Sequence, residues 1–148
     1  MTYLPLTRPF SRPLQILMAS WEGTSLSVGG AFTITVLGGT FSATSTGTSL
    51  TLPSGHYFVQ AFIDISRPDN SENNTQYAVY ADGQEVGVKG NSDVYQNNST
   101  DSADAEFTLT SEGSLEIKVT AIENSFPTVT SNSRLIVWRT DTTAQVTP

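Results

Sequence analysis

The sequence predicts an all-β fold, an antiparallel β-sandwich or jelly roll of about eight strands with an extended N-terminal arm. Three observations support this prediction. The 148 residues include 18 serines and 21 threonines but only 14% charged residues, so the long straight-chain helix formers are scarce. Apolar residues recur with a period of two, and turn residues interrupt them at fairly regular spacing. No segment longer than a few residues shows a helical period.

The length and composition fit one domain without covalent staples. A chain of this size with 37% hydrophobic residues can bury a core of its own, and it contains no cysteine for a disulfide or a zinc ribbon. We divide it into an arm (1–13), a β-sandwich domain (14–141) and a short tail (142–148). The arm is predicted to be extended because three X-Pro steps exclude a helix there.

The first two strands follow from period-two alternation. Leu14, Ile16 and Met18 alternate with their neighbours over residues 14–19. A second run, at 32–37, alternates in the same way and is closed by two glycines. Both segments are therefore predicted as strands.

The longest apolar face belongs to the segment 57–65. Its odd-numbered residues, from Tyr57 to Ile65, are all apolar, while its even-numbered residues are half apolar. This pattern is typical of a central strand that is partly covered on both sides. Arg67-Pro68-Asp69-Asn70 ends the run as a turn.

Two hairpins are predicted from their turn sequences. The first joins two strands across Asp82-Gly83, because residues that tolerate positive φ fit such tight turns. The second is expected to join 105–110 to 114–122 through a turn that includes Gly113. A last strand, S-R-L-I-V-W-R-T, follows. The eight predicted strands are 14–19, 32–37, 57–65, 76–81, 85–88, 105–110, 114–122 and 133–140.

The charge argues against nucleic acid and membrane partners. The formal net charge is -7 and the pI is about 4.4, so electrostatic capture of a polyanion or an anionic bilayer is not expected. Twelve of the 14 acidic residues lie between residues 51 and 125. The N-terminus has no long apolar core, so neither a signal peptide nor a membrane anchor is expected.

The sequence predicts no catalytic residue, no metal site and no cofactor, and hence no enzyme. A serine triad needs a histidine base, and His56 is the single histidine, placed where a turn leads into a strand. Acidic groups near Asp69 and near Asp104 offer oxygen ligands, but their spacing is not that of an EF-hand. The acidic residues are more simply explained as a solubilising surface.

Two stretches carry a resemblance to a known fold family. The sequence from Ser49 to Tyr57, S-L-T-L-P-S-G-H-Y, resembles the start of a long strand in jelly rolls of the tumour-necrosis-factor and C1q-like type. Residues 133–139 are similar to the closing strand of that type as it occurs in small bacteriophage virion proteins. The resemblance covers about residues 49–140, and the chain departs from it in having no collagen-like repeat and no cysteine.

The resemblance implies a homotrimer in which the first and last strands are neighbours in one sheet near the threefold axis. The residues agree, because apolar side chains lie on both faces of the two terminal strands, and a face that the second sheet leaves open needs another cover. The expected subunit interface consists of Leu14, Ile16, Met18, Ile136 and Trp138.

The resemblance further implies a capsid decoration, or cement, protein. It would bind the major capsid protein at the outer capsid surface of the virion, stabilise the shell, and be made in the host cytoplasm without a signal peptide. The predicted docking segment is the arm, with Arg8, Pro9, Phe10 and Arg12.

The alternative is the receptor-binding tip of a phage fibre that recognises host glycans through asparagine-rich loops, and a secreted C1q-like module is disfavoured by the missing signal peptide. The loop residues for that alternative are Asp69, Asn73, Asn74, Tyr95, Asn97 and Asn98.

Overall fold

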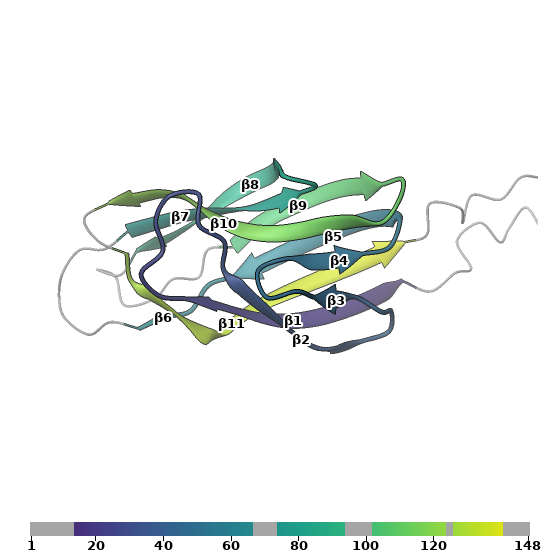
Figure 1. The fold of residues 1–148 in the computed structure, drawn as a ribbon, viewed down its shortest axis with the longest axis horizontal. Coiled ribbons are helices and arrows are strands. Elements are labelled where there is room, and N and C mark those ends of the chain that lie inside the picture. The colour runs from purple at the N-terminus through teal and green to yellow at the C-terminus, as the bar shows by residue number, and fades with distance from the viewer. Residues whose placement is uncertain (1–13, 67–73, 94–101, 124–125, 141–148) are drawn as a thin grey trace, which may run out of the picture.

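The computed structural model describes residues 14–66, 74–93, 102–123 and 126–140. Within them the chain is built from antiparallel strands, which confirms the all-β prediction (Figure 1). No helix in these ranges is long and apolar enough to cross a lipid bilayer. The described strands are β1 (Gln15–Gly23), β2 (Thr33–Gly39), β3 (Thr44–Ser45), β4 (Leu50–Leu52), β5 (Gly55–Phe62), β6 (Ile65–Ser66), β7 (Asn74–Ala81), β8 (Gln84–Asp93), β9 (Ser102–Leu109), β10 (Gly113–Glu123) and β11 (Thr128–Thr140).

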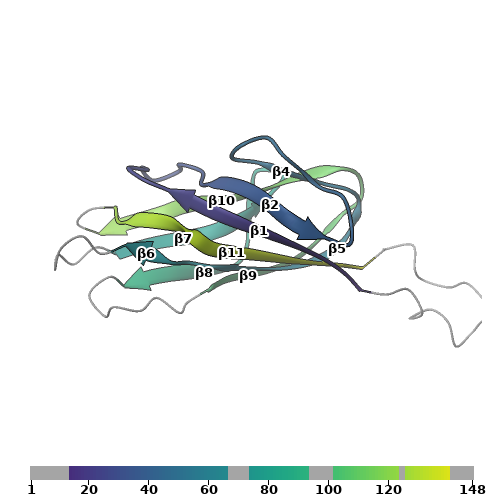
Figure 2. The ribbon, with the colours of Figure 1, turned by 90° about the horizontal axis from the view of Figure 1, so that it is seen from below.

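The strands form two layers around one core (Figures 1 and 2). The strand order is β2-β1-β11-β5-β9-β8-β7-β10-β4-β3, and β6 adds to β11. The first five strands of this order make one layer and the last five make the other. The two layers are joined along one side, where β8 pairs with β9 at Val88 and Asp104. This is the jelly-roll arrangement that the sequence predicts.

The first and last strands of the domain lie side by side, as the resemblance implies. β1 pairs antiparallel with β11, from Gln15 opposite Arg139 to Trp21 opposite Ser133. β11 in turn pairs with β5 along most of the length of β5. The described part of the chain therefore begins and ends at the same end of the sandwich.

The core lies between the two layers. It is filled by the side chains at alternate positions of each strand, which point inward. Trp21 is its largest member, with ring centroids 4.8 Å from Phe32 and 5.2 Å from Tyr77. The indole nitrogen of Trp21 donates to the carbonyl of Arg134 at 3.0 Å, so the buried polar atom is satisfied. The odd-numbered residues of β5 point into this core, as their alternation predicts, from Tyr57 onward.

The first predicted hairpin is confirmed. β7 and β8 pair up to Ala81 opposite Gln84, and the two turn residues, Asp82 and Gly83, both have positive φ, at 50° and 81°. This is the backbone that a two-residue hairpin with the twist of the sheet requires.

The second predicted hairpin is wrong. β9 and β10 do not pair: β9 pairs with β5, and β10 pairs with β7 and β4 in the opposite layer. Leu109 and Leu115, on either side of the turn, are both buried in the core, each from its own layer. The turn therefore carries the chain across the core instead of between neighbours.

The strand count differs from the expected eight. Eleven strands are present in the described residues, because β3, β4 and β6 have only two or three residues each, too few to show an alternation. The predicted strand 57–65 is divided: β5 ends at Phe62, and Ile65 belongs to β6, which pairs with Val129 of β11.

Candidate functional site

The outer face of the layer β1-β11-β5-β9 carries apolar side chains where a solvent-facing sheet normally carries polar ones. The register sets the outward residues of neighbouring strands side by side: Ile16 opposite Trp138, and Trp138 opposite Phe58. Two residues farther along β1, Met18 lies opposite Ile136. We call this surface the apolar sheet face, and its members are Ile16, Met18, Phe58, Phe62, Ile136 and Trp138.

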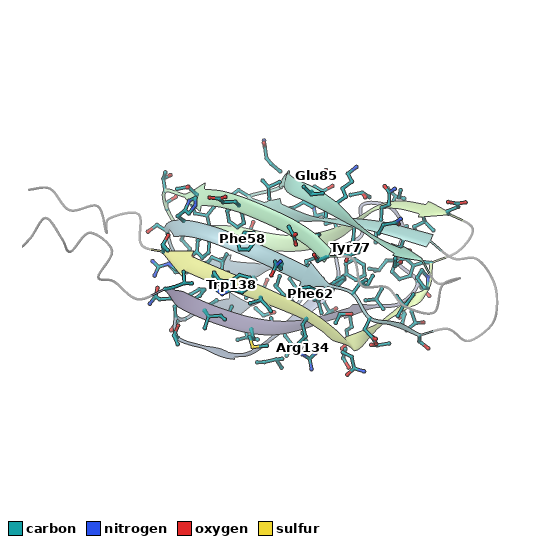
Figure 3. All side chains as sticks on the ribbon, turned by 180° about the vertical axis from the view of Figure 1, so that it is seen from behind. Phe58, Phe62, Tyr77, Glu85, Arg134 and Trp138 are labelled. Atoms are coloured by element: carbon teal, nitrogen blue, oxygen red, sulfur yellow. The ribbon has the colours of Figure 1, made fainter. Side chains whose placement is uncertain are left out.

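Two aromatic rings stack on each other on the apolar sheet face (Figure 3). The rings of Phe58 and Trp138 stack with centroids 5.4 Å apart and an angle of 24° between their planes. Phe58 is still 41% exposed and Met18 is 40% exposed. A stacked aromatic pair that keeps this much contact with water is a large apolar surface that the described residues leave partly uncovered.

The structure places four of the five predicted interface residues together. Ile16, Met18, Ile136 and Trp138 lie on adjacent strands and on the same side of the layer. Leu14 precedes β1 and is 56% exposed.

Phe58 and Phe62 were missed by the prediction, which gave only the two terminal strands to the interface. Their signal was the half-apolar second face of the segment 57–65. That face is partly covered, as its pattern predicts, because Phe62 is half-buried while Phe58 keeps 41% of its surface exposed. The pairing of β5 with β11 brings these rings beside Trp138, and the sequence pattern of neither strand predicts that pairing.

The β9 side of the face is polar and acidic. Asp104 and Glu106 point outward from β9, opposite Gln60 and Phe58 of β5. Ser102 donates a hydrogen bond to Asp104 at 2.8 Å.

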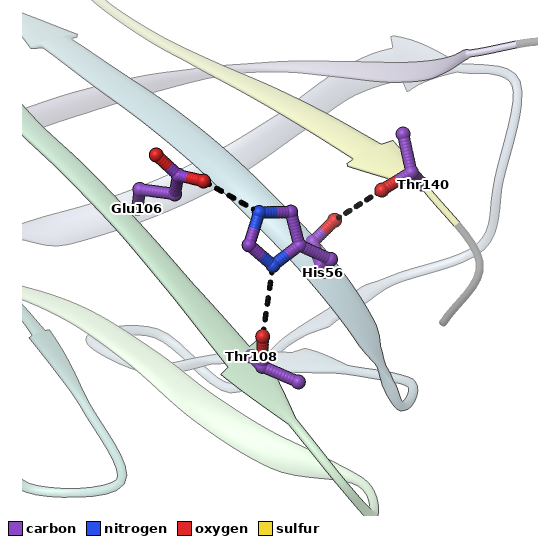
Figure 4. Close-up of polar contacts among 4 residues, drawn as sticks. All are labelled: His56, Glu106, Thr108 and Thr140. Atoms are coloured by element: carbon purple, nitrogen blue, oxygen red, sulfur yellow. Dashed lines mark hydrogen bonds and ion pairs between the residues drawn. The ribbon is translucent and has the colours of Figure 1, made fainter. Parts of the chain in front are cut away.

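His56 lies at the same border and is held by two partners (Figure 4). Its Nε2 is 2.7 Å from Oε2 of Glu106, and its Nδ1 is 2.8 Å from Oγ1 of Thr108. The hydroxyl of Thr140 donates to the His56 carbonyl at 3.5 Å. The side chains of His56 and Glu106 are 40% and 66% exposed, so this is a solvent-exposed contact between neighbouring strands. His56 is the second residue of β5, which agrees with its predicted place where a turn leads into a strand.

Arg139, near the end of β11, forms hydrogen bonds to residues near the starts of β5 and β1. Arg139 donates to the carbonyl of Ser54 through Nε at 3.1 Å and Nη2 at 2.6 Å, and also to the side-chain oxygen of Gln15. It lies beside Tyr57, whose hydroxyl donates to the carbonyl of Pro53 at 2.5 Å. Burial raises the pKa of the Tyr57 phenol, and this outweighs the neighbouring Arg139 charge, which lowers it. The contacts fix the end of β11 against the start of β5.

Several predicted site residues lie outside the described residues. These are the arm positions Arg8, Pro9, Phe10 and Arg12 and the loop positions Asp69, Asn73, Tyr95, Asn97 and Asn98. The backbone of Asn74 begins β7, opposite Asp93. Both sets stay predictions. Within the described ranges, no group of three or more histidine, aspartate or glutamate side chains is placed to hold a metal ion.

Comparison with known proteins identifies the fold. No family profile matches the sequence, and no curated protein matches it. Solved structures do match: murine APRIL at pH 8.0 has a TM-score of 0.63 at 14% identity, with 86% of this chain and 100% of that chain covered. The structure of murine APRIL at pH 8.5 gives a TM-score of 0.62 at 14% identity, and that at pH 5.0 gives 0.57 at 11%, with the same coverage of both chains. At these identities the likeness concerns the fold alone: the chain is a jelly roll of the tumour-necrosis-factor type.

Proposed function

We propose that the protein is a non-enzymatic homotrimer that assembles through the apolar sheet face. The observation that carries the proposal is the Phe58–Trp138 stack, which is left open on the outside of the layer that contains both terminal strands. Burying such a surface against a second copy removes apolar area from water, which is the main favourable term in association. The resemblance to trimeric jelly rolls supports threefold closure.

We further propose the finer role of a capsid decoration protein on the virion surface, with the major capsid protein as its partner. Supporting features are the acidic middle of the chain, the proline-containing arm with Arg8 and Arg12, and the lack of any catalytic constellation in the sequence. A protein that binds the assembled shell and not its separated parts stabilises the shell by mass action.

The trimer is tested first, by light scattering over a range of concentrations. A mass of three chains supports the proposal. A monomer of about 16 kDa at every concentration contradicts it, because the apolar sheet face would then be stable in water.

The decoration role is tested on capsids stripped of the protein. Adding it back is expected to raise the temperature at which the shell opens, and a variant lacking residues 1–12 is expected to fold and trimerise without binding. Unchanged melting of the shell rejects the role, and normal binding by the truncated variant rejects the function of the arm. A selective hit on a glycan array would instead favour the fibre tip.

A further inference from the structure

Two charged groups of opposite sign lie on the apolar sheet face, and among the described residues neither contacts a group of opposite charge. Arg134 points outward from β11, opposite Phe62 of β5. Its Nη1 donates to the carbonyls of Ser131 and Ser133, at 2.8 and 3.1 Å, and within the described residues no carboxylate pairs with it. Asp104 likewise has no cation among the described side chains; it accepts only from Ser102.

The two charges do not face each other within one copy. β5 lies between β11 and β9, so the strands that carry Arg134 and Asp104 are about 10 Å apart at the usual strand spacing. Arg134 is also level with Ser102 and not with Asp104, because both Arg134 and Ser102 pair with Phe62. Each charge is therefore available to a neighbouring molecule.

Covering the apolar sheet face would remove water from both groups. A charge taken out of water without a counterion is strongly unfavourable, so a second copy that covers the face has to supply a partner for each. The carboxylate of Asp104 is the complement of the Arg134 guanidinium. A second copy of this chain thus carries what the first one lacks, provided that the two faces meet in the right orientation.

A symmetric face-to-face dimer with its axis through the middle of the apolar sheet face does not bring them together. One possible twofold axis runs along the strands through the middle of the face. It places the acidic residues of β9 in one copy, Asp104 and Glu106, over Ile16 and Met18 of β1 in the other copy. With the axis across the strands, the β9 acids lie over each other, and like charges repel. A head-to-tail contact, in which two different patches meet, avoids both outcomes, and it forms a ring when the rotation from one copy to the next closes.

Building on the proposed self-association, we infer that Arg134 of one copy pairs with Asp104 of the next around the ring. Glu106, already bound to His56, lies on the same side of the next copy and adds to its negative potential. The ion pair sets the order in which the copies meet, while the rings of the apolar sheet face supply the buried area.

The inference is tested by charge reversal and exchange. Sedimentation equilibrium is measured for the wild-type chain, for Arg134→Glu, for Asp104→Lys, and for an equimolar mixture of the two variants. Arg134→Gln serves as a milder variant, and Glu112→Lys, in the exposed turn before β10, is the matched reversal away from the face. Thermal melting followed by circular dichroism shows that each variant is folded.

Each reversal is expected to weaken association by about tenfold or more, because it places like charges against each other. In the mixture, a ring with two copies of one variant and one of the other regains the attraction at two of its three contacts and keeps one like-charge contact. It is therefore expected to associate more strongly than either variant alone and more weakly than the wild type. Glu112→Lys is expected to behave as wild type. If Arg134→Glu does not fold, Arg134→Gln and Asp104→Lys still decide the outcome.

The outcomes distinguish failure of the proposed self-association from failure of the Arg134–Asp104 ion pair. If the wild type stays monomeric, the proposed self-association fails. If the wild type assembles and the variants of Arg134 and Asp104 assemble equally well, the ion pair is wrong while the trimer stands. If both reversals weaken assembly but the mixture is no stronger than either variant alone, the two residues do not meet, and the inference is overturned.

Discussion

Phe58→Ser is the substitution that most directly tests the role of the apolar sheet face. Phe58 is 41% exposed in the single chain, and the rest of its surface is covered by its neighbours, with Trp138 stacked on its ring. A cover supplied by another copy would hide the exposed part. The substitution removes the ring and leaves the strand pairing of β5 with β11 and β9 unchanged, because serine keeps the same backbone groups.

The size of the effect follows from the exposed area. About 40% of the roughly 200 Å² of an aromatic side chain is about 80 Å², and at about 25 cal/mol per Å² this is about 2 kcal/mol per copy. In a closed trimer every copy loses this contribution, so about 6 kcal/mol is lost in total. Within the single chain, loss of the covered part of the ring, about 120 Å², is expected to cost about 3 kcal/mol of unfolding free energy at the same coefficient.

Sedimentation equilibrium measures the trimer and urea unfolding measures the single chain. Val28→Ser is the matched control, because Val28 is 61% exposed and lies outside the apolar sheet face, in the segment between β1 and β2. We expect Phe58→Ser to dissociate at concentrations where Val28→Ser remains assembled. Equal association constants for the two variants would show that this face is not the interface.

Two further predictions concern the fold. Gly87→Ala is expected to cost about 3 kcal/mol or more of unfolding free energy, because φ at Gly87 is +75° and an added Cβ would lie 2.0 Å from the carbonyl oxygen of Asp104. Gly29→Ala, at φ +90° with open space around it, is expected to cost only about 1 kcal/mol in urea unfolding, and equal losses would contradict the close approach. For Tyr57, burial raises the folded-state pKa above the unfolded value of about 10, so the neutral phenol stabilises the fold fully below about pH 10, and this contribution is lost as the pH rises through the folded-state pKa. The unfolding free energy of the wild type should therefore fall relative to that of Tyr57→Phe above about pH 10, and parallel pH profiles would refute this.

Local patterns predicted much of the fold. The alternation in 14–19, 32–37 and 133–140 reports which side of each strand is apolar, and Asp82-Gly83 specifies a tight turn by its own backbone preference. These patterns do not show which strands pair with each other. The turn before Gly113 looks like a hairpin turn, yet the strands on either side pair with strands far away in the sequence. Partner choice depends on how all the strands share one core, which no short segment encodes.

The candidate site was predictable to the same degree. Ile16, Met18, Ile136 and Trp138 were predictable because an apolar residue on the second face of a strand stands out in the sequence. Phe58 stood out equally, but whether its side of β5 is covered depends on the layer arrangement, and nothing in the alternation distinguishes an inner cover from an open face. That Arg134 and Asp104 lie on the same face, with one strand between theirs, follows from the order of the strands in the layer and cannot be read from a short segment.

The opposite layer provides an internal comparison for the apolar sheet face. On its outer side the ring of Tyr80 lies 5.0 Å from the ammonium group of Lys118, which is 3.6 Å from Glu116, and the Tyr80 hydroxyl donates to Glu85 at 3.3 Å. These groups satisfy one another within one chain and need no cover. Among the described residues, the layer with β1 and β11 instead leaves an aromatic stack partly exposed and two opposite charges without a group of opposite charge beside them. Because the same chain builds both faces, the contrast supports the proposal that copies associate through the layer that contains the terminal strands.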